Sequence, residues 1–174
     1  MKNNKTKKLI LSAFFLALGI VLPYLTALNK EIGDSLLPMH IPVMLTSLYC
    51  GSFYGFAVGL VMPFIKSLIS SMPPLYPNAV WMATELLTYG FMLGFLTKKV
   101  KNIYISLIVT MLLGRATWGI AKCILLGVGE NGFTLTMFIM GGFVDSLLGI
   151  IIQLILIPLI WRKNKNERNN ISLR

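Results

Sequence analysis

Residues 103–126 read IYISLIVTMLLGRATWGIAKCILL, an apolar run that contains only two charged side chains, Arg115 and Lys122. A helix needs roughly 20 apolar residues, within a range of about 17–25, to cross the hydrocarbon core of a bilayer. The run has that length, and its apolar residues are not confined to the one face that a soluble helix buries. It therefore predicts a helix that crosses a membrane.

Five more apolar runs occur in the 174-residue chain, which is 56% hydrophobic and 13% charged, whereas soluble domains carry about 25% charged residues. We expect the last run to be tilted or bent near Pro158, and three prolines within residues 72–77 to form a stiff loop. The sequence predicts an all-α polytopic membrane protein: a single domain of about six transmembrane helices over residues 1–161, then a basic, disordered cytoplasmic tail over residues 162–174. The six expected spans cover residues 9–28, 37–49, 54–71, 78–97, 103–126 and 133–161.

Basic residues border the apolar runs, and their positions predict the orientation of the chain. The loops expected on the side of the membrane opposite these basic residues hold one basic residue, Lys30, and three acidic residues, Glu31, Asp34 and Glu130. Cytoplasmic segments of membrane proteins carry the excess of Lys and Arg, so we expect both termini in the cytoplasm. The chain has a net charge of +10, and the same distribution indicates that its basic residues lie beside a lipid bilayer and do not bind nucleic acid. Twelve of the 16 basic residues form three clusters: Lys2, Lys5, Lys7 and Lys8; Lys98, Lys99 and Lys101; Arg162, Lys163, Lys165, Arg168 and Arg174.

Ionisable residues inside the expected spans are candidates for a binding site. A charge at the centre of a bilayer costs at least about 2.5–3.5 kcal/mol, so such residues should face the interior of the bundle and pair there. With the termini inside, all of them fall at the midplane or in the outer half. An outward-opening polar cavity accounts for this pattern better than a continuous channel. The residues concerned are Lys66, Glu85, Arg115, Lys122 and Asp145, with His40 and Asn78 near span ends.

Helical spacing groups these residues with aromatic side chains that would form apolar walls of the site. Three cations face two anions, so one cation would remain for an anionic solute. In the alternative interpretation the charges only pair with each other, the tryptophans only pack, and His40 is only interfacial. The shared faces are Asn78, Trp81, Glu85 and Tyr89; Arg115, Trp118 and Lys122; Gly55, Gly59, Met62 and Lys66; and Gly141, Asp145, Gly149 and Gln153.

Enzymatic and metal chemistry find little support in the residues. The chain has one His, no clustered carboxylates of the kind that hold a metal, and no phosphate-binding glycine loop followed by Lys and Ser or Thr. Cys50 and Cys123 lie in or beside apolar runs, as buried small hydrophobic residues do. We expect neither a metal nor a cofactor, and a transporter of this kind that uses ATP must take its ATPase from another chain.

Several segments resemble the substrate-binding S components of energy-coupling factor (ECF) transporters, over essentially the whole chain. The segment 13-AFFLA-17 fits the family's Ala-x-x-x-Ala motif, and 37-LPMHIPV-43 also looks like S components for water-soluble vitamins. Met72-Pro73-Pro74, which leads to Glu85, looks like these S components too, and together these features are similar to the branch that includes pantothenate carriers.

The resemblance implies partners and a mechanism. Ala13 and Ala17 would dock on a transmembrane coupling subunit that works with two ATPase subunits. The S component would capture a vitamin-like solute outside a bacterial cell membrane, topple, and release the solute inside. The alternative is a secondary transporter for a small polar solute that functions alone.

Overall fold

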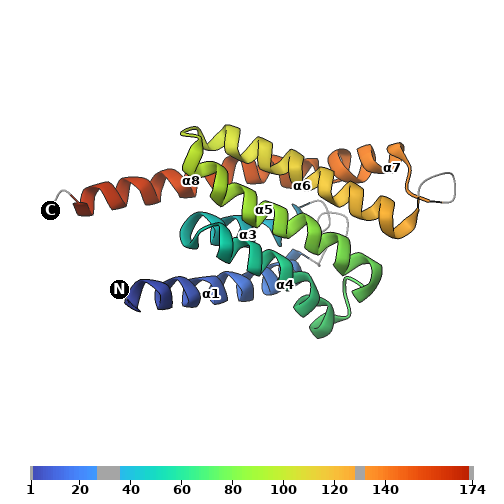
Figure 1. Ribbon diagram of the computed structural model, residues 1–174, viewed down its shortest axis with the longest axis horizontal. Coiled ribbons are helices and arrows are strands. Elements are labelled where there is room, and N and C mark those ends of the chain that lie inside the picture. The colour runs from blue at the N-terminus through green and yellow to red at the C-terminus, as the bar shows by residue number, and fades with distance from the viewer. Residues whose placement is uncertain (1, 27–35, 128–131, 173–174) are drawn as a thin grey trace.

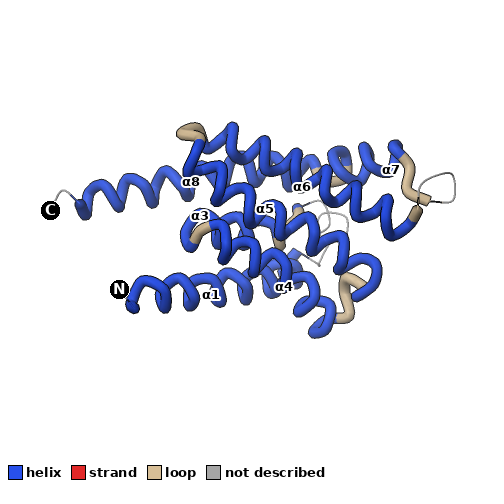
Figure 2. The backbone as a smooth tube through the Cα atoms, viewed as in Figure 1, coloured by secondary structure: helices blue, strands red, loops and turns tan. Residues whose placement is uncertain are grey.

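The computed structural model describes residues 2–26, 36–127 and 132–172, and these residues form helices joined by short turns, without strands (Figure 2). The long elements are apolar along most of their length. Because they are helices, each also satisfies its backbone hydrogen bonds internally, as a membrane requires. The elements are α1 (Lys2–Thr26), α3 (His40–Cys50), α4 (Ser52–Ser70), the π-helix η1 (Leu75–Ala79), α5 (Val80–Lys99), α6 (Ile103–Leu126), α7 (Leu135–Ile139), the π-helix η2 (Met140–Val144) and α8 (Leu147–Ser172).

Four stretches of helix are long and apolar enough to cross a membrane, and a fifth span results if α7, η2 and α8 are counted together across a bend of 43°. The prediction of a polytopic all-α membrane protein is confirmed. Helix α3 has 11 residues, which extend about 16 Å and fall short of a hydrocarbon core of about 30 Å. The expected count of about six therefore includes one helix that is too short to span.

Helix α3 lies inside the bundle, where it contacts α1, α4, α5 and α8. Glycines let its neighbours α4 and α5 approach closely, because a Cβ added to Gly55 or Gly59 would overlap backbone atoms of Gly90 or Leu86. The hydroxyl of Ser47 on α3 donates to the Gly90 carbonyl of α5. Helices α3, α4 and α5 thus form one closely packed unit.

The interior holds an apolar cluster that we call the inner cluster, to which α3, α5, α6 and α8 all contribute. The outside of the bundle is apolar as well. Phe53, Leu68 and Ile124 are each about three-quarters exposed, at 76%, 76% and 77%. An apolar exterior around an apolar interior is the pattern of a bundle surrounded by lipid. The buried residues of the inner cluster are Met44, Leu48, Tyr89, Leu93, Ile103, Leu107, Met111 and Ile157.

The C-terminal part of the chain differs from the expectations in the position of its bend and in the structure of its tail. The bend lies at residues 145–146, not near Pro158, which lies within the continuous helix α8. The cause is the π-helix η2, where the Asp145 amide donates to the Met140 carbonyl five residues back. The chain beyond residue 161, expected to be disordered, is helical to Ser172. It contains no Gly or Pro over residues 162–172, and extending an existing helix by one residue costs little.

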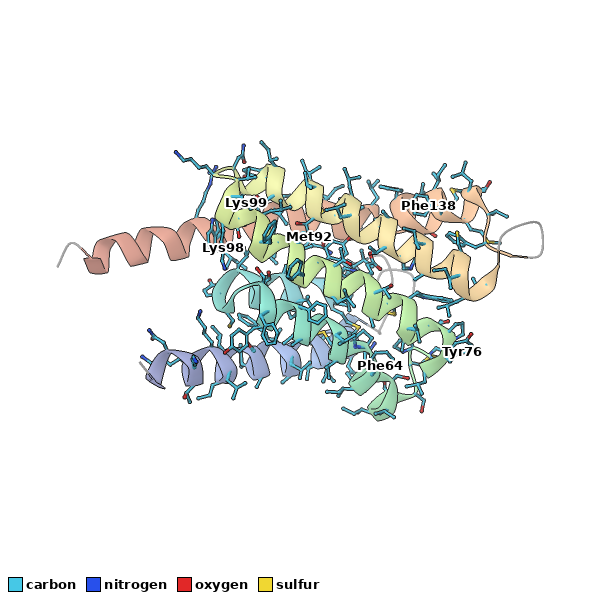
Figure 3. All side chains as sticks on the ribbon, viewed as in Figure 1. Phe64, Tyr76, Met92, Lys98, Lys99 and Phe138 are labelled. Carbon is cyan, nitrogen blue, oxygen red and sulfur yellow. The ribbon has the colours of Figure 1, made fainter. Side chains whose placement is uncertain are left out.

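Both termini lie at the same end of the bundle (Figure 1). Figure 3 shows Lys98 and Lys99 toward that end, whereas Tyr76 and Phe138 lie toward the opposite end. The fold therefore gathers the basic residues that border α1, α5 and α8 at one end of the molecule.

Candidate functional site

A buried ionic cluster joins α3, α5 and α6. The carboxylate Oε1 of Glu85 lies 2.8 Å from Arg115 Nη1 and 3.3 Å from His40 Nε2. All three residues are almost completely buried, with exposures of 2–4%. A buried charge without a partner is expensive, so Glu85 stabilises the burial of Arg115 and Arg115 that of Glu85.

Tyr89 supports this cluster from one turn further along α5. Its ring meets the His40 ring edge-on, with 5.0 Å between the centroids, and its hydroxyl donates to the Met111 carbonyl at 3.5 Å. Gly114 makes room for the ring, because a Cβ there would lie 2.6 Å from Tyr89 Cε2. The residue before Arg115 thus brings α5 and α6 close enough for the Arg115–Glu85 pair to form.

Arg115 is only partly satisfied by Glu85. Among the described residues, neither its Nε nor its Nη2 has a hydrogen-bond partner, and the same is true of His40 Nδ1. A guanidinium presents its donors in a planar fork that fits a carboxylate with two parallel hydrogen bonds. One side of the guanidinium is held by Glu85, so the other can bind a second anion.

A second cation lies among aromatic rings beside this cluster. Lys122 Nζ is 4.2 Å from the ring centroid of Trp118, 4.8 Å from that of Trp81 and 5.4 Å from that of Phe133. Ring faces attract cations, so the three rings hold the ammonium in place. The Trp118 ring also lies 6.0 Å from Arg115 Cζ. Trp118 therefore connects the two cations.

The predicted site residues separate into two groups. Asn78 in η1 and Lys66 on α4 are partly buried. Asp145 is exposed, contrary to the expectation that it faces the bundle interior. It lies at the break after η2, where regular helical spacing no longer applies. The predicted site residues that lie together in the structure are His40, Trp81, Glu85, Tyr89, Arg115, Trp118 and Lys122.

Sequence reasoning did not select Gln153. Its side chain is 1% exposed, and neither its amide oxygen nor its amide nitrogen has a hydrogen-bond partner among the described residues. Helical spacing had aligned it with Gly141, Asp145 and Gly149, but the charge of Asp145 drew attention to the wrong member of that face. The useful signal was a long polar amide among Ile and Leu residues, deep in the last span.

An open apolar pocket lies elsewhere, between α6 and α7, with a volume of about 460 Å³. Apolar residues such as Ile120, Ile124 and Phe138 line it, so it offers few groups that hold a polar solute. The described residues also contain no group of three or more His, Cys, Asp or Glu side chains placed to bind a metal ion. The ionic cluster remains the stronger candidate for a solute site.

Helix α1 turns its two motif alanines away from the bundle. Ala13 and Ala17 are exposed, while Ser12 and Phe15 are buried on the other side of the helix. Only 17% of the apolar stretch of α1 is buried, against 50% in α5 and in α6. The two alanines therefore do not serve packing within the described part of the bundle, and they lie on a surface that another helix can reach.

The sequence model of the family described as "ECF transporter, substrate-specific component" matches residues 7–161. No curated protein and no solved structure matches the chain.

Proposed function

We propose the following function for the chain, which belongs to the family of substrate-specific components of ECF transporters. It is a multi-pass membrane subunit of a transporter that binds the solute to be transported. The proposal concerns the solute and the partners. The chain captures a small anionic, water-soluble vitamin on the outer side of a bacterial plasma membrane, with pantothenate as the leading substrate.

The observation that carries the proposal is the half-satisfied guanidinium of Arg115. It is 4% exposed and keeps two nitrogen atoms without hydrogen-bond partners among the described residues, while Glu85 holds a third. A carboxylate placed there would accept charge-assisted hydrogen bonds from a group whose orientation is already set. Because Glu85 neutralises Arg115 in the free protein, the arriving carboxylate also draws on the second cation, Lys122.

The neighbouring side chains suit the rest of such a solute. Trp81 and Trp118 provide apolar surface beside the two cations, and His40 Nδ1 is a buried polar atom without a partner among the described residues. Pantothenate combines one carboxylate with two hydroxyls, one amide and a compact dimethyl group. A pocket with a cationic centre, aromatic walls and a few polar atoms matches that combination. Lys66 and Asn78 are proposed to contact the solute from the outer end of α4 and from η1, which precedes α5.

We expect both termini and the turn after α5 to be cytoplasmic, so that the Glu85–Arg115 cluster opens outward. The support is the gathering of basic residues at the end of the bundle where both termini lie (Figure 1). A cysteine at Lys99, in a protein lacking Cys50 and Cys123, should be labelled by a membrane-impermeant maleimide only after the cells are opened. Labelling in intact cells would reverse the orientation.

The energy source distinguishes the proposed function from its alternative, a secondary transporter that works alone. Family membership implies that the chain works with a coupling subunit and ATPase subunits. We propose one coupling subunit and two ATPase subunits. Liposomes that contain this chain with that module should accumulate radiolabelled pantothenate only when ATP is supplied to the ATPases. Liposomes with the chain alone should bind pantothenate but not accumulate it. Accumulation by the chain alone, driven by a proton or sodium gradient, would establish the alternative.

A further inference from the structure

Helix α8 and the segment before it present one buried face to the bundle. Gly149, Gln153 and Ile157 recur every four residues and lie along one side of α8, and the buried Gly142 and Ser146 precede them across the 43° bend. At its outer end Gly142 lies against Arg115 and Trp118, because a Cβ there would be 4.0 Å from Arg115 Cδ and 3.6 Å from Trp118 Cζ3. At its inner end Ile157 belongs to the inner cluster. The buried residues along this face are Gly142, Ser146, Gly149, Gln153 and Ile157.

Between Gly142 and Gln153 the residues on this face are small and nearly apolar. Ser146 is satisfied within the chain, since its hydroxyl donates to the Gly142 carbonyl. Gly149 has no side chain. Gln153, about 10 Å further along the helix than Ser146 at 1.5 Å per residue, is therefore the first polar group on this face whose hydrogen-bonding atoms remain unused. It lies one turn from Ile157, and Ile150 and Leu154, its neighbours on α8, also pack against the inner cluster.

We propose that Gln153 is a second anchor of the solute site, and that the solute lies lengthwise against the Gly142–Gln153 face of α8, its carboxylate at Arg115 and a hydroxyl or amide group at Gln153. This proposal rests on the solute-binding function proposed above and adds to it a residue, a direction and a requirement on the solute. The solute must carry an uncharged polar group several bonds away from its carboxylate.

The chemistry of the amide supports this role. A carboxamide has one acceptor oxygen and a nitrogen with two donors, so it pairs with neutral groups that both donate and accept. Leaving those atoms unpaired in an apolar interior is unfavourable, and buried polar groups in proteins nearly always have partners. Gln153 has two such atoms, and Arg115, on a different helix, has two more. Two orphaned groups on α6 and α8, with only small residues between them on α8, mark the two ends of one solute.

Gln153→Leu tests the proposal, with Thr110→Val as a matched control. Leucine has a similar size to glutamine and removes only the amide. Thr110 is also fully buried, and its hydroxyl also has no partner among the described residues, but it lies beside Met111 of the inner cluster. Calorimetric titration with pantothenate should show binding weakened by about tenfold or more in Gln153→Leu, and unchanged binding in Thr110→Val. The melting temperature of either variant without added vitamin should be equal to or above that of the wild type.

Panthenol, in which an alcohol replaces the carboxylate of pantothenate, separates the two anchors. With panthenol the effect of Arg115→Ala should largely disappear, whereas the effect of Gln153→Leu should persist. If the Gln153→Leu effect disappears together with the carboxylate, Gln153 acts on the charged end and the proposed direction is wrong. Equal weakening by Gln153→Leu and Thr110→Val, or full affinity in Gln153→Leu, also overturns the proposal.

The wild-type titration tests the proposed function separately. If the wild type does not bind pantothenate, the substrate proposed above is wrong, and the same variants are then titrated with nicotinate, biotin, folate, riboflavin and thiamine. Selective weakening in Gln153→Leu with whichever of these binds would still support the second anchor, and its absence would remove it. If none of them binds, neither the vitamin-binding function nor the second anchor stands.

Discussion

Arg115→Ala is expected to weaken pantothenate binding by about 2–5 kcal/mol, which corresponds to roughly 30- to 5000-fold in the dissociation constant. The physical reason is the loss of charge-assisted hydrogen bonds to a carboxylate inside a water-excluded site. The same substitution should lower the melting temperature, because it leaves the carboxylate of Glu85 buried without the cation that lies 2.8 Å away. Calorimetric titration and thermal unfolding in detergent measure the two effects.

A double variant separates binding from packing. In Arg115→Ala/Glu85→Gln the uncompensated carboxylate is replaced by a neutral amide, so stability should return toward the wild-type value while binding stays weak. If Arg115 serves only to neutralise Glu85, the double variant should regain both stability and affinity. Glu85→Gln alone is a further control, since it leaves an unpaired Arg115 that would still attract a carboxylate. Recovery of full affinity in the double variant would remove Arg115 from the solute site.

Helical periodicity was sufficient to predict much of the grouping of side chains in the ionic and aromatic cluster. The spacing of Trp81, Glu85 and Tyr89 on one helix, and of Arg115, Trp118 and Lys122 on another, depends only on 3.6 residues per turn. Both segments form uninterrupted helices, α5 from Val80 and α6 from Ile103, so the predicted faces exist in the structure. What spacing does not contain is the rotation of one helix relative to the next. The pairing of Arg115 with Glu85, in preference to Asp145, therefore appears only in three dimensions.

The last span shows where the same reasoning fails. A regular helix over residues 133–161 would place Asp145 and Gln153 on one face. Instead, a π-helix precedes residues 145–146, and the chain bends by 43° at these two residues. Asp145 is therefore exposed while Gln153, beyond the break, is buried. Proline is the usual marker of a bend, yet Pro158 does not break α8. No comparably strong signal in the sequence marks the Gly141–Gly142 pair as the weaker point.

The charge count was also too simple. Three cations against two anions suggested one unpaired cation among the spans, whereas Arg115 pairs with Glu85 and Lys122 lies among aromatic rings. A ring face is an uncharged partner, and no count of acidic residues includes it. The anion site that we propose therefore uses the unpaired nitrogen atoms of Arg115 together with Lys122, and not a single cation that has no neighbour.

The second large effect is expected at the other side of the molecule, on α1. Replacing Ala13 or Ala17 with Trp should abolish ATP-driven uptake while pantothenate binding by the isolated subunit stays unchanged. Two exposed methyl-sized side chains one turn apart let another helix approach the α1 backbone closely, and an indole at either position would hold it away. Overpacking of a close contact costs about 1–3 kcal/mol, which corresponds to roughly 5- to 150-fold weaker association.

The surface of α6 supplies the control for this test. Ala116 is also an exposed alanine on a membrane helix, and it belongs to the groove between α6 and α7 instead of the α1 face. Ala116→Trp adds the same bulk to a lipid-facing surface, so it should leave both association with the module and uptake near wild-type levels. Co-purification of the module with each variant, followed by uptake into liposomes, distinguishes a docking defect from a general effect of a surface indole.

The solute site and the α1 alanines belong to different helices and different faces of the bundle, so their functions should fail independently. Loss of pantothenate binding in Ala13→Trp, with the complex still formed, would show that α1 belongs to the solute site and not to the interface.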